Sequence, residues 1–320
     1  MQLRKYLVTG GCGFLGSALV HRLVKEGHFV RVFDNQSRGN IQRLKSLEDN
    51  IEFVEADIRE AEAVRNAARE MDCIIHMAFV NGTEYFYSRP ELVLDVGIKG
   101  MINVLDACKV ENIRELVLVS SSEVYQTPPR SPTDESVPLS IPDPFNPRYS
   151  YAAGKIISEI MAINYGRSLK RAMIVRPHNV YGPDMGKDHV IPQFILRMRE
   201  LSRNPIPSKI KFPIQGTGDE TRAFVYIEDF INGLMLLLNR GEHLNIYNIG
   251  TPDEVTISRV AFEIGKFFRR DIEIIQGEFF PGSPRHRCPD ISKIKKLGYQ
   301  PQYTLTNGLR LTVRWYDENS

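Results

Sequence analysis

The sequence predicts an α/β fold: a doubly wound parallel sheet with helices on both faces, plus a smaller mixed C-terminal region. Short apolar runs alternate with segments of helical periodicity over the first 180 residues. The runs are continuously apolar, as expected for strands that are covered on both faces. Strands that alternate with helices form β-α-β units, whose right-handed crossovers give a parallel sheet.

The expected elements follow one another along the chain. The strands are six apolar runs, Tyr6–Thr9, Phe29–Phe33, Ile51–Val54, Cys73–Met77, Leu116–Val119 and Met173–Val175. Apolar residues at helical spacing predict helices over Ser17–Lys25, Ile98–Lys109, Ile227–Leu238 and Ser258–Phe268. Residues 127–147 contain seven prolines, which predicts an ordered loop. We expect one domain over residues 1–180 and a smaller one over 181–320, interleaved with the first.

Composition excludes several classes of partner. The chain has 41 Lys and Arg against 39 Asp and Glu, and the basic residues are scattered. Binding to nucleic acid normally needs a basic stripe, so we expect no nucleic-acid partner. The best apolar stretch, Phe230 to Leu238, is interrupted by Asn232 and Gly233, so we expect no membrane partner. The four cysteines lack metal or disulfide spacing, which predicts no metal site and a reducing cytoplasmic location.

A glycine-rich segment follows the first expected strand and opens the first expected helix. Its glycines allow a tight turn and let the backbone approach a pyrophosphate, as in the Rossmann dinucleotide-binding loop. The helix N-terminus offers free N–H groups and a positive dipole end to the phosphates. We assign to this loop Gly10, Gly13, Phe14, Leu15 and Gly16.

A carboxylate at the end of the second strand selects the dinucleotide. Asp34 stands 18 residues after Gly16, where it accepts hydrogen bonds from the adenosine ribose and repels a 2′-phosphate. This predicts NAD rather than NADP, although Arg38 is a counter-signal. Asp57 and Ile58, after the third strand, are placed to meet the adenine.

Tyr151 and Lys155 stand four residues apart and so share one helical face. An ammonium beside the phenol, together with a positive nicotinamide ring, is expected to lower the tyrosine pKa. Such a phenolate takes a proton from an alcohol as hydride leaves for NAD. Tyr149 is a competing phenol, but Ala153 stands where its lysine would be. A surface pair is the alternative explanation for the spacing.

The serines that follow the fifth strand lie at the carboxyl edge, where ligands bind an open parallel sheet. With these motifs in this order, the chain resembles the extended short-chain dehydrogenase/reductase family, and within it the nucleotide-sugar epimerases, dehydratases and decarboxylases. The resemblance runs from about Lys5 to Trp315. It is carried by residues 9–16, 34–35, 57–59, 76–78, 120–125, 151, 155, 176–183, 221–226 and 287–290.

The resemblance implies roles for individual residues. It implies a catalytic group formed by Ser121, Tyr151, Lys155 and Glu123. It implies NAD contacts, beyond those already named, at Asn35, Ala78, Tyr151 and Lys155. It implies a nucleotide-diphosphate sugar as substrate, held by Ser122, Asn179, Arg222 and Arg287. Guanidinium forks match phosphate geometry, although an arginine taken singly is more often a surface charge.

The shared first step of this family is hydride abstraction at sugar C4, which gives a 4-keto intermediate. Its 4,6-dehydratases carry an Asp-Glu pair where this chain has Ser122-Glu123, whereas Ser-Glu-Val-Tyr is more similar to UDP-glucuronate decarboxylases. We expect an epimerase/dehydratase-type enzyme, with decarboxylation or net 4-dehydrogenation as alternatives. Glu123 is equally well explained as a base or as a charge paired with an arginine.

Four positions depart from the family pattern. Gly97 replaces an asparagine, Gly154 replaces a serine, and Met77 and Phe79 replace smaller residues. A simple carbonyl reductase would share the glycine loop and the Tyr-Lys pair, and a non-catalytic dinucleotide sensor would lack that pair. The resemblance also implies a homodimer formed by the helix near residue 98 and the helix that carries Tyr151. Apolar positions consistent with both a dimer and core packing are Ile102, Leu105, Ile156, Ile160 and Ile163.

Overall fold

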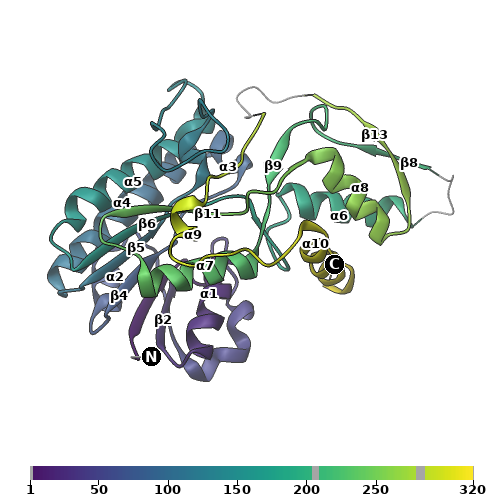
Figure 1. Cartoon of the computed structure of the whole chain (residues 1–320). Coiled ribbons are helices and arrows are strands. Elements are labelled where there is room, and N and C mark those ends of the chain that lie inside the picture. The colour runs from purple at the N-terminus through teal and green to yellow at the C-terminus, as the bar shows by residue number, and fades with distance from the viewer. Residues whose placement is uncertain (1–2, 204–208, 279–284, 320) are drawn as a thin grey trace. The chain divides into compact units, whose positions relative to one another are not determined.

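The computed structural model describes residues 3–203, 209–278 and 285–319 (Figure 1). The chain divides into two compact units. Unit 1 comprises Met1–Gln126, Pro138–Pro177 and Ile231–Asn248; unit 2 comprises Thr127–Val137, His178–Phe230 and Ile249–Ser320. Residues 127–137 and 231–248 therefore fall on the other side of a simple division at residue 180. Each of these segments packs with parts of the chain that are remote in sequence.

Unit 1 is built on a parallel sheet whose order, over the described residues, is β11-β6-β5-β4-β1-β2-β3. The strands are β1 (Lys5–Thr9), β2 (Phe29–Asp34), β3 (Ile51–Glu55), β4 (Cys73–His76), β5 (Glu115–Val119), β6 (Arg171–Pro177) and β11 (Asn245–Ile249). All pairings from β3 across to β6 are parallel. The fold class and the six expected strands are confirmed, and β11 is an additional strand.

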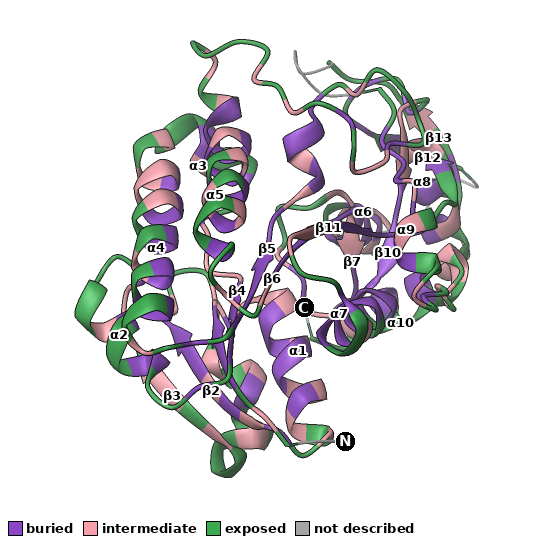
Figure 2. Ribbon diagram, turned by 60° about the vertical axis from the view of Figure 1, so that its left-hand side comes forward, coloured by how far each residue is buried: buried purple, intermediate pink, exposed green. Residues whose placement is uncertain are grey.

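Helices cover both faces of this sheet. They are α1 (Phe14–Lys25), α2 (Ala61–Ala68), α3 (Thr83–Ser88), α4 (Pro90–Val110) and α5 (Ser150–Gly166). Short 3-10 segments are η1 (Ile41–Asn50), η2 (Ser122–Tyr125) and η3 (Pro147–Tyr149). Figure 2 shows α2, α4 and α5 against one face and α1 against the other. On the α4 side the buried core runs from strand residues such as Leu116 to Val104 of α4 and Tyr151 of α5.

Unit 2 contains short strands and helices. Two-stranded sheets pair β7 (Val180–Tyr181) with β10 (Val225–Tyr226), β9 (Thr221–Ala223) with β12 (Glu254–Thr256), and β8 (Lys209–Pro213) with β13 (Asp271–Ile275). The helices are α6 (Val190–Leu201), α8 (Ile257–Phe267), α9 (Ser292–Lys295) and α10 (Leu305–Asn319). Helix α7 (Ile227–Arg240) begins in unit 2 and continues into unit 1. The expected helices near residues 227 and 258 are thus confirmed as α7 and α8.

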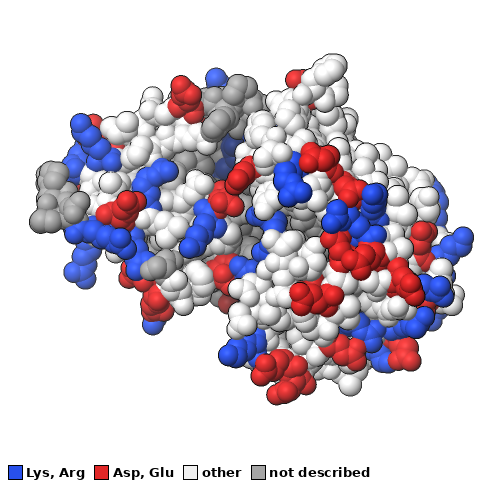
Figure 3. All heavy atoms as spheres, turned by 180° about the vertical axis from the view of Figure 1, so that it is seen from behind, with Lys and Arg blue, Asp and Glu red and all other residues white. Residues whose placement is uncertain are grey.

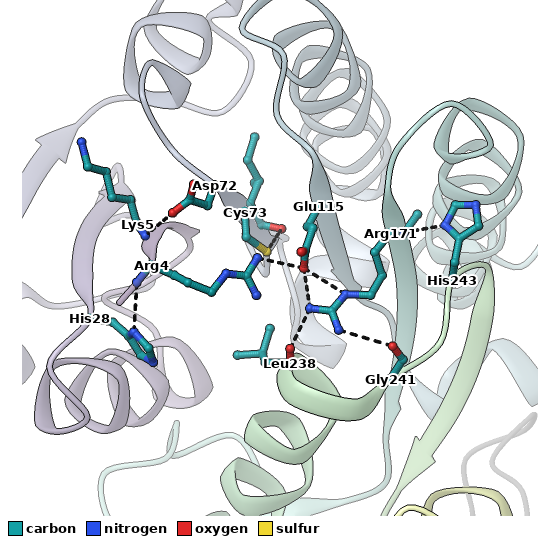
Figure 4. Close-up of polar contacts among 12 residues, drawn as sticks. Arg4, Lys5, His28, Asp72, Cys73, Glu115, Arg171, Leu238, Gly241 and His243 are labelled. Atoms are coloured by element: carbon teal, nitrogen blue, oxygen red, sulfur yellow. Dashed lines mark hydrogen bonds and ion pairs between the residues drawn. The ribbon is translucent and has the colours of Figure 1, made fainter. Parts of the chain in front are cut away.

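An ionic cluster ties the sheet together at the amino ends of its strands (Figure 4). Glu115, at the start of β5, is 7% exposed and accepts contacts from two arginines. Arg4 Nη2 lies 2.8 Å from Glu115 Oε2, and Arg171 Nε lies 2.9 Å from the same oxygen. Arg171 also donates to the Leu238 carbonyl oxygen, 2.6 Å away near the end of α7. This cluster is structural, because ligands bind at the opposite, carboxyl edge of a parallel sheet.

Four further observations bear on membrane, metal, disulfide and charge-based interactions. Among the described residues, no helix has both the length and the apolar character needed to cross a membrane. Within the same ranges, no cluster of three or more His, Cys, Asp or Glu has the arrangement of a metal site. The four cysteines are free thiols and buried. Figure 3 shows basic and acidic side chains interspersed over the face that it presents.

Candidate active site

The glycine loop connects β1 to α1 at the carboxyl edge of the sheet, where the strand order reverses between β1 and β4. Gly10 has a φ of 72°, and a Cβ there would lie 2.8 Å from the Ala78 backbone nitrogen. A Cβ at Gly16 would lie 2.2 Å from the Gly10 carbonyl oxygen. Gly13 is the N-cap of α1 and makes no side-chain cap, so the first-turn N–H groups of α1 are left to a ligand.

Asp34 ends β2 beside this loop. Its carboxylate accepts hydrogen bonds from the backbone N–H groups of Cys12, at 2.9 Å, and Gln36, at 2.7 Å. Burial raises its pKa. A carboxylate has about four lone-pair positions, so these two bonds leave room for ribose hydroxyls. A Cβ at Gly39 would lie 3.0 Å from Asp34 Oδ1, so the absence of a side chain at Gly39 leaves space beside this carboxylate, a contact that the sequence did not reveal.

Asn35 and Asp57 meet beside Asp34, at the ends of β2 and β3. Asn35 Nδ2 donates to Asp57 Oδ2 at 3.0 Å, and Arg59 donates to both Asp57 oxygens at 2.9 and 2.8 Å. These Arg59 bonds lower the pKa of Asp57 to about 2. Ile58 is 4% exposed and lies against α4. Arg38, the counter-signal for NAD, lies over the Tyr85 ring with 4.9 Å between its Cζ and the ring centroid.

Thr9 fixes the loop after β4 against the glycine loop, a contact that the sequence did not predict. Its Oγ1 accepts from the backbone N–H groups of Met77, at 3.2 Å, and Ala78, at 3.3 Å. The same hydroxyl pairs with His76 Nδ1 at 2.8 Å. Ala78 is thereby held beside Gly10, at the position expected for a cofactor contact.

The proposed catalytic side chains meet within unit 1. Tyr151 and Lys155 lie on α5 and are 6% and 3% exposed, so the alternative of a surface pair is wrong. Lys155 Nζ donates to the Val119 carbonyl oxygen at 2.8 Å and lies 5.8 Å from the Tyr151 ring centroid. Ser121 hydrogen bonds to the Tyr151 phenol. Its Oγ also accepts from the Glu123 N–H at 3.2 Å, which orients the serine.

Burial corrects the expected pKa of the phenol. Desolvation raises the pKa of Tyr151, and the negative charge of Glu123 raises it further, while the hydrogen bond from Ser121 lowers it. Burial likewise lowers the pKa of Lys155 to about 7. The sequence-based expectation of a lowered tyrosine pKa is therefore wrong for the protein alone, because spacing along a helix carries no information on desolvation. The positive charge of a bound nicotinamide ring acts in the opposite direction.

A buried polar network lies beside the Tyr151–Lys155 pair. Glu159, on the same helix as Lys155, accepts from Ser120 Oγ at 2.5 Å and from Arg176 Nε at 2.9 Å. Arg176 Nη1 donates to the Tyr125 hydroxyl at 2.7 Å. Glu159 and Arg176 are 1% and 2% exposed, so both charges are compensated inside the core. The Glu159 charge also raises the pKa of Lys155 against the effect of burial.

The predicted substrate residues fall in both units. Ser122 lies in unit 1 and is buried. In unit 2, the other three lie around Ala223 of β9. Asn179 Nδ2 donates to the Ala223 carbonyl oxygen at 3.3 Å, and the Ala223 N–H donates to the Arg287 carbonyl oxygen at 3.0 Å. Arg222 directly precedes Ala223 in the chain, so unit 2 brings Asn179, Arg222 and Arg287 together. Asn179 has a φ of 41°, a conformation that asparagine tolerates better than most residues.

These features fit a bound dinucleotide. The loop leaves no room for a Cβ at Gly10 or Gly16, the first turn of α1 offers N–H groups, and Asp34 keeps acceptor positions. The family model of NAD-dependent epimerases and dehydratases matches residues 6–250. The chain belongs to this family. It is accordingly an enzyme with NAD as its cofactor, as the sequence predicts.

Relatives in this family differ in the reaction that their names give. UDP-glucuronic acid decarboxylase 6 of Arabidopsis thaliana is 34% identical over 317 residues, which cover 96% of this chain and 87% of that protein. A UDP-N-acetyl-alpha-D-glucosaminuronate decarboxylase of Bacillus cytotoxicus is 28% identical and covers 98% of each chain. A trifunctional UDP-glucose 4,6-dehydratase of Arabidopsis thaliana is 32% identical, but this chain spans only 48% of its length.

Solved structures agree with the fold. A dTDP-glucose 4,6-dehydratase from Streptomyces venezuelae, solved with NAD bound, has a TM-score of 0.87 at 29% identity. The match covers 98% of this chain and 97% of the dehydratase chain. A UDP-glucose 4-epimerase from Thermotoga maritima, solved with UDP-glucose, has a TM-score of 0.86 at 26% identity and covers 98% and 99%. The short-chain dehydrogenase/reductase resemblance is thereby confirmed.

Proposed function

We propose that the protein oxidises C4 of a nucleoside diphosphate sugar with NAD and then completes an epimerisation, dehydration or decarboxylation. The observation that carries the proposal is the buried Tyr151 phenol, hydrogen bonded to Ser121 and adjacent to the Lys155 ammonium. NAD supplies the hydride acceptor when it is bound. The family membership and the nucleotide sugars named for its relatives support the substrate class.

Each side chain has a defined part in this proposal. Tyr151 takes the proton of the C4 hydroxyl, and Ser121 holds the same oxygen by a hydrogen bond. Lys155, anchored on the Val119 carbonyl oxygen, supplies the positive charge that favours the phenolate. Arg222 and Arg287 bind the diphosphate, because guanidinium groups match its geometry.

A panel of nucleotide sugars tests the proposal. Wild-type protein and the Tyr151→Phe variant are incubated with NAD and UDP-, GDP- or dTDP-sugars, and products are weighed by mass spectrometry. Unchanged mass with changed stereochemistry, loss of water, loss of CO₂ and loss of two hydrogens identify the four outcomes. Turnover of a simple ketone and of no nucleotide sugar would support a carbonyl reductase instead.

Decarboxylation of a nucleotide hexuronate is the second candidate. Ser122 occupies the position where the 4,6-dehydratases carry an acid, so dehydration lacks its proton donor at that position. Oxidation at C4 turns a C6 carboxylate into a β-keto acid. Its C5–C6 bond then breaks to release CO₂, and the electron pair is delocalised onto the C4 carbonyl before a proton returns to C5. UDP-glucuronate decarboxylases among the relatives support this outcome.

A UDP-hexuronate and the corresponding UDP-hexose separate this candidate from the others. The decarboxylation proposal expects CO₂ loss from the acid and little turnover of the neutral hexose. Efficient 4-epimerisation of the hexose, with the acid inert, would eliminate it. Water loss from the hexose would show instead that a group other than residue 122 protonates the leaving hydroxyl.

We further propose a homodimer formed through α4 and α5, in the cytoplasm. Ile102 and Ile160 on these helices are 41% and 54% exposed, whereas Leu105 and Ile163 pack into the core of unit 1. Light scattering at micromolar concentration should give twice the 36.6 kDa of one chain. Ile160→Glu should halve that mass, and Phe262→Glu on α8, a residue of comparable exposure, should leave it unchanged. A monomeric wild type contradicts the dimer.

The proposed cytoplasmic location is supported by the four free, buried thiols, which are typical of a reducing compartment.

A further inference from the structure

The Phe79 ring fills a socket that two glycines leave open. Phe79 follows β4, and its ring points at α4 and α5. A Cβ at Gly97 of α4 would lie 2.2 Å from Phe79 Cζ, and a Cβ at Gly154 of α5 would lie 3.0 Å from the same atom. Glycine inside a helix is destabilising relative to alanine. Two helix-interior glycines that face one ring therefore indicate that the position of the ring matters.

This ring contacts both members of the Tyr-Lys pair. The Phe79 and Tyr151 ring centroids are 5.1 Å apart with an interplanar angle of 84°, an edge-to-face arrangement. Lys155 Nζ lies 4.2 Å from the Phe79 centroid, closer than the 5.8 Å to the Tyr151 centroid. A cation over an aromatic face within about 6 Å is attracted by the ring quadrupole, most strongly where water is excluded. Lys155 is 3% exposed.

We propose that Phe79 is a positioning residue, which holds the Lys155 ammonium by a cation–π contact and the Tyr151 ring by an edge contact in the socket left by Gly97 and Gly154. The proposal deepens the proposed function, since it concerns the same Tyr-Lys pair. The residues that depart from the family pattern at positions 79, 97 and 154 thus form one packing unit.

The effect of the Phe79 ring on the Lys155 pKa can be distinguished from the effects of the neighbouring charged and titratable groups. Glu159, one helical turn further along α5, raises the pKa of Lys155, while burial lowers it to about 7. His76, at the end of β4, is kept neutral because burial and the Lys155 charge lower its pKa to about 3. Tyr151, one helical turn earlier on α5, is a third titratable neighbour. Removal of the Phe79 ring leaves all three groups in place and removes one attraction for the ammonium.

The test is an NMR titration of the Lys155 side chain in the cofactor-free protein, which needs no substrate. Phe79→Leu should lower the Lys155 pKa by about half a unit to one unit. Phe86→Leu is the matched control, because Phe86 stacks on Tyr151 at 5.1 Å, whereas the aromatic rings close to Lys155 Nζ among the described residues are those of Phe79 and Tyr151. The control should leave the Lys155 pKa at its wild-type value.

A second set of variants separates positioning from packing. Gly97→Ala should lower the melting temperature, because the new methyl group collides with the ring. Gly97→Ala combined with Phe79→Leu should recover most of that loss, yet keep the lowered Lys155 pKa. This double variant also serves for the titration where Phe79→Leu alone does not fold.

The outcomes distinguish the two proposals. Where a substrate is turned over, the alkaline limb of the rate profile should move to lower pH with Phe79→Leu, in step with the Lys155 pKa. A Phe79→Leu protein with a lower melting temperature, an unchanged Lys155 pKa and an unchanged rate profile would show that the ring only packs. Absence of turnover with every nucleotide sugar would contradict the proposed function and leave the titration result intact.

Discussion

The Lys155 ammonium donates a 2.8 Å hydrogen bond to the carbonyl oxygen of Val119, the last residue of β5. This bond ties the helix that carries Tyr151 to the strand that leads into Ser121. The base, the hydroxyl and the ammonium are therefore fixed by secondary structure rather than by flexible loops. Such preorganisation is what a site for hydride and proton transfer requires.

Asp34→Ala should weaken NAD binding and relax the preference over NADP, because we propose that the carboxylate accepts hydrogen bonds from the ribose hydroxyls and repels a 2′-phosphate. Isothermal titration with both dinucleotides measures this change. The carboxylate also holds the Cys12 and Gln36 N–H groups, so Asp34→Asn serves as a control that keeps an acceptor for one of them. Tighter binding of NADP than NAD by the wild-type protein would contradict the assignment.

Glu123→Gln should lower the pKa of Tyr151, because the Glu123 charge raises it. The acid limb of the oxidation step should then move to lower pH. If Glu123 also acts after oxidation, NADH and a 4-keto intermediate accumulate, which ultraviolet absorbance detects. Unchanged rates, pH profile and melting temperature in this variant would exclude every role for the residue.

His76→Asn should make the protein less sensitive to acid. Burial holds the folded-state pKa of His76 at about 3, against an ordinary value of 6.5. Between these values the unfolded chain binds the proton and the folded chain does not, so stability falls as pH drops from about 6.5 toward about 3. Urea unfolding at about pH 7 and about pH 5 should show a smaller loss in the variant. An equal loss in both proteins contradicts the prediction.

Glu115→Gln should destabilise unit 1 by about 2–3 kcal/mol, because Arg4 and Arg171 then face each other without a buried carboxylate. Glu52→Gln is the matched control. Its carboxylate also binds an arginine, Arg31, but is 50% exposed, so we expect a loss of about 0–1 kcal/mol. Denaturant unfolding compares the two, and equal losses would remove the special role of the Glu115 cluster.

Local sequence patterns were sufficient to predict most of the fold. The six continuous apolar runs, the glycine loop and the Tyr151–Lys155 spacing are short-range signals, and each lies where the sequence predicts. Strand β11 was missed because Asn245–Ile249 contains two asparagines and so forms no continuous apolar run, and because it joins the sheet far from its sequence neighbours. The membership of residues 127–137 in unit 2 depends in the same way on contacts between segments that are distant in sequence.

Side-chain contacts between segments that are distant in sequence could not be predicted from the sequence. Gly97, Gly154 and Phe79 are recognisable as departures from a family pattern, but only the structure shows that they touch. The Thr9–His76 and Arg176–Glu159 contacts are equally non-local. The direction of the Tyr151 pKa was missed because burial is a property of the folded core.

The central claim is that C4 of the sugar gives up its hydride to NAD while Tyr151 takes the proton. Its most direct test is a single turnover with excess enzyme, NAD and a substrate nucleotide sugar deuterated at C4, followed by mass spectrometry of the quenched dinucleotide. We predict reduced dinucleotide that carries one deuterium, formed roughly 10²–10⁴-fold more slowly by Tyr151→Phe although that variant still binds NAD. Product formed at the full rate with no deuterium on the dinucleotide at any time would contradict the account.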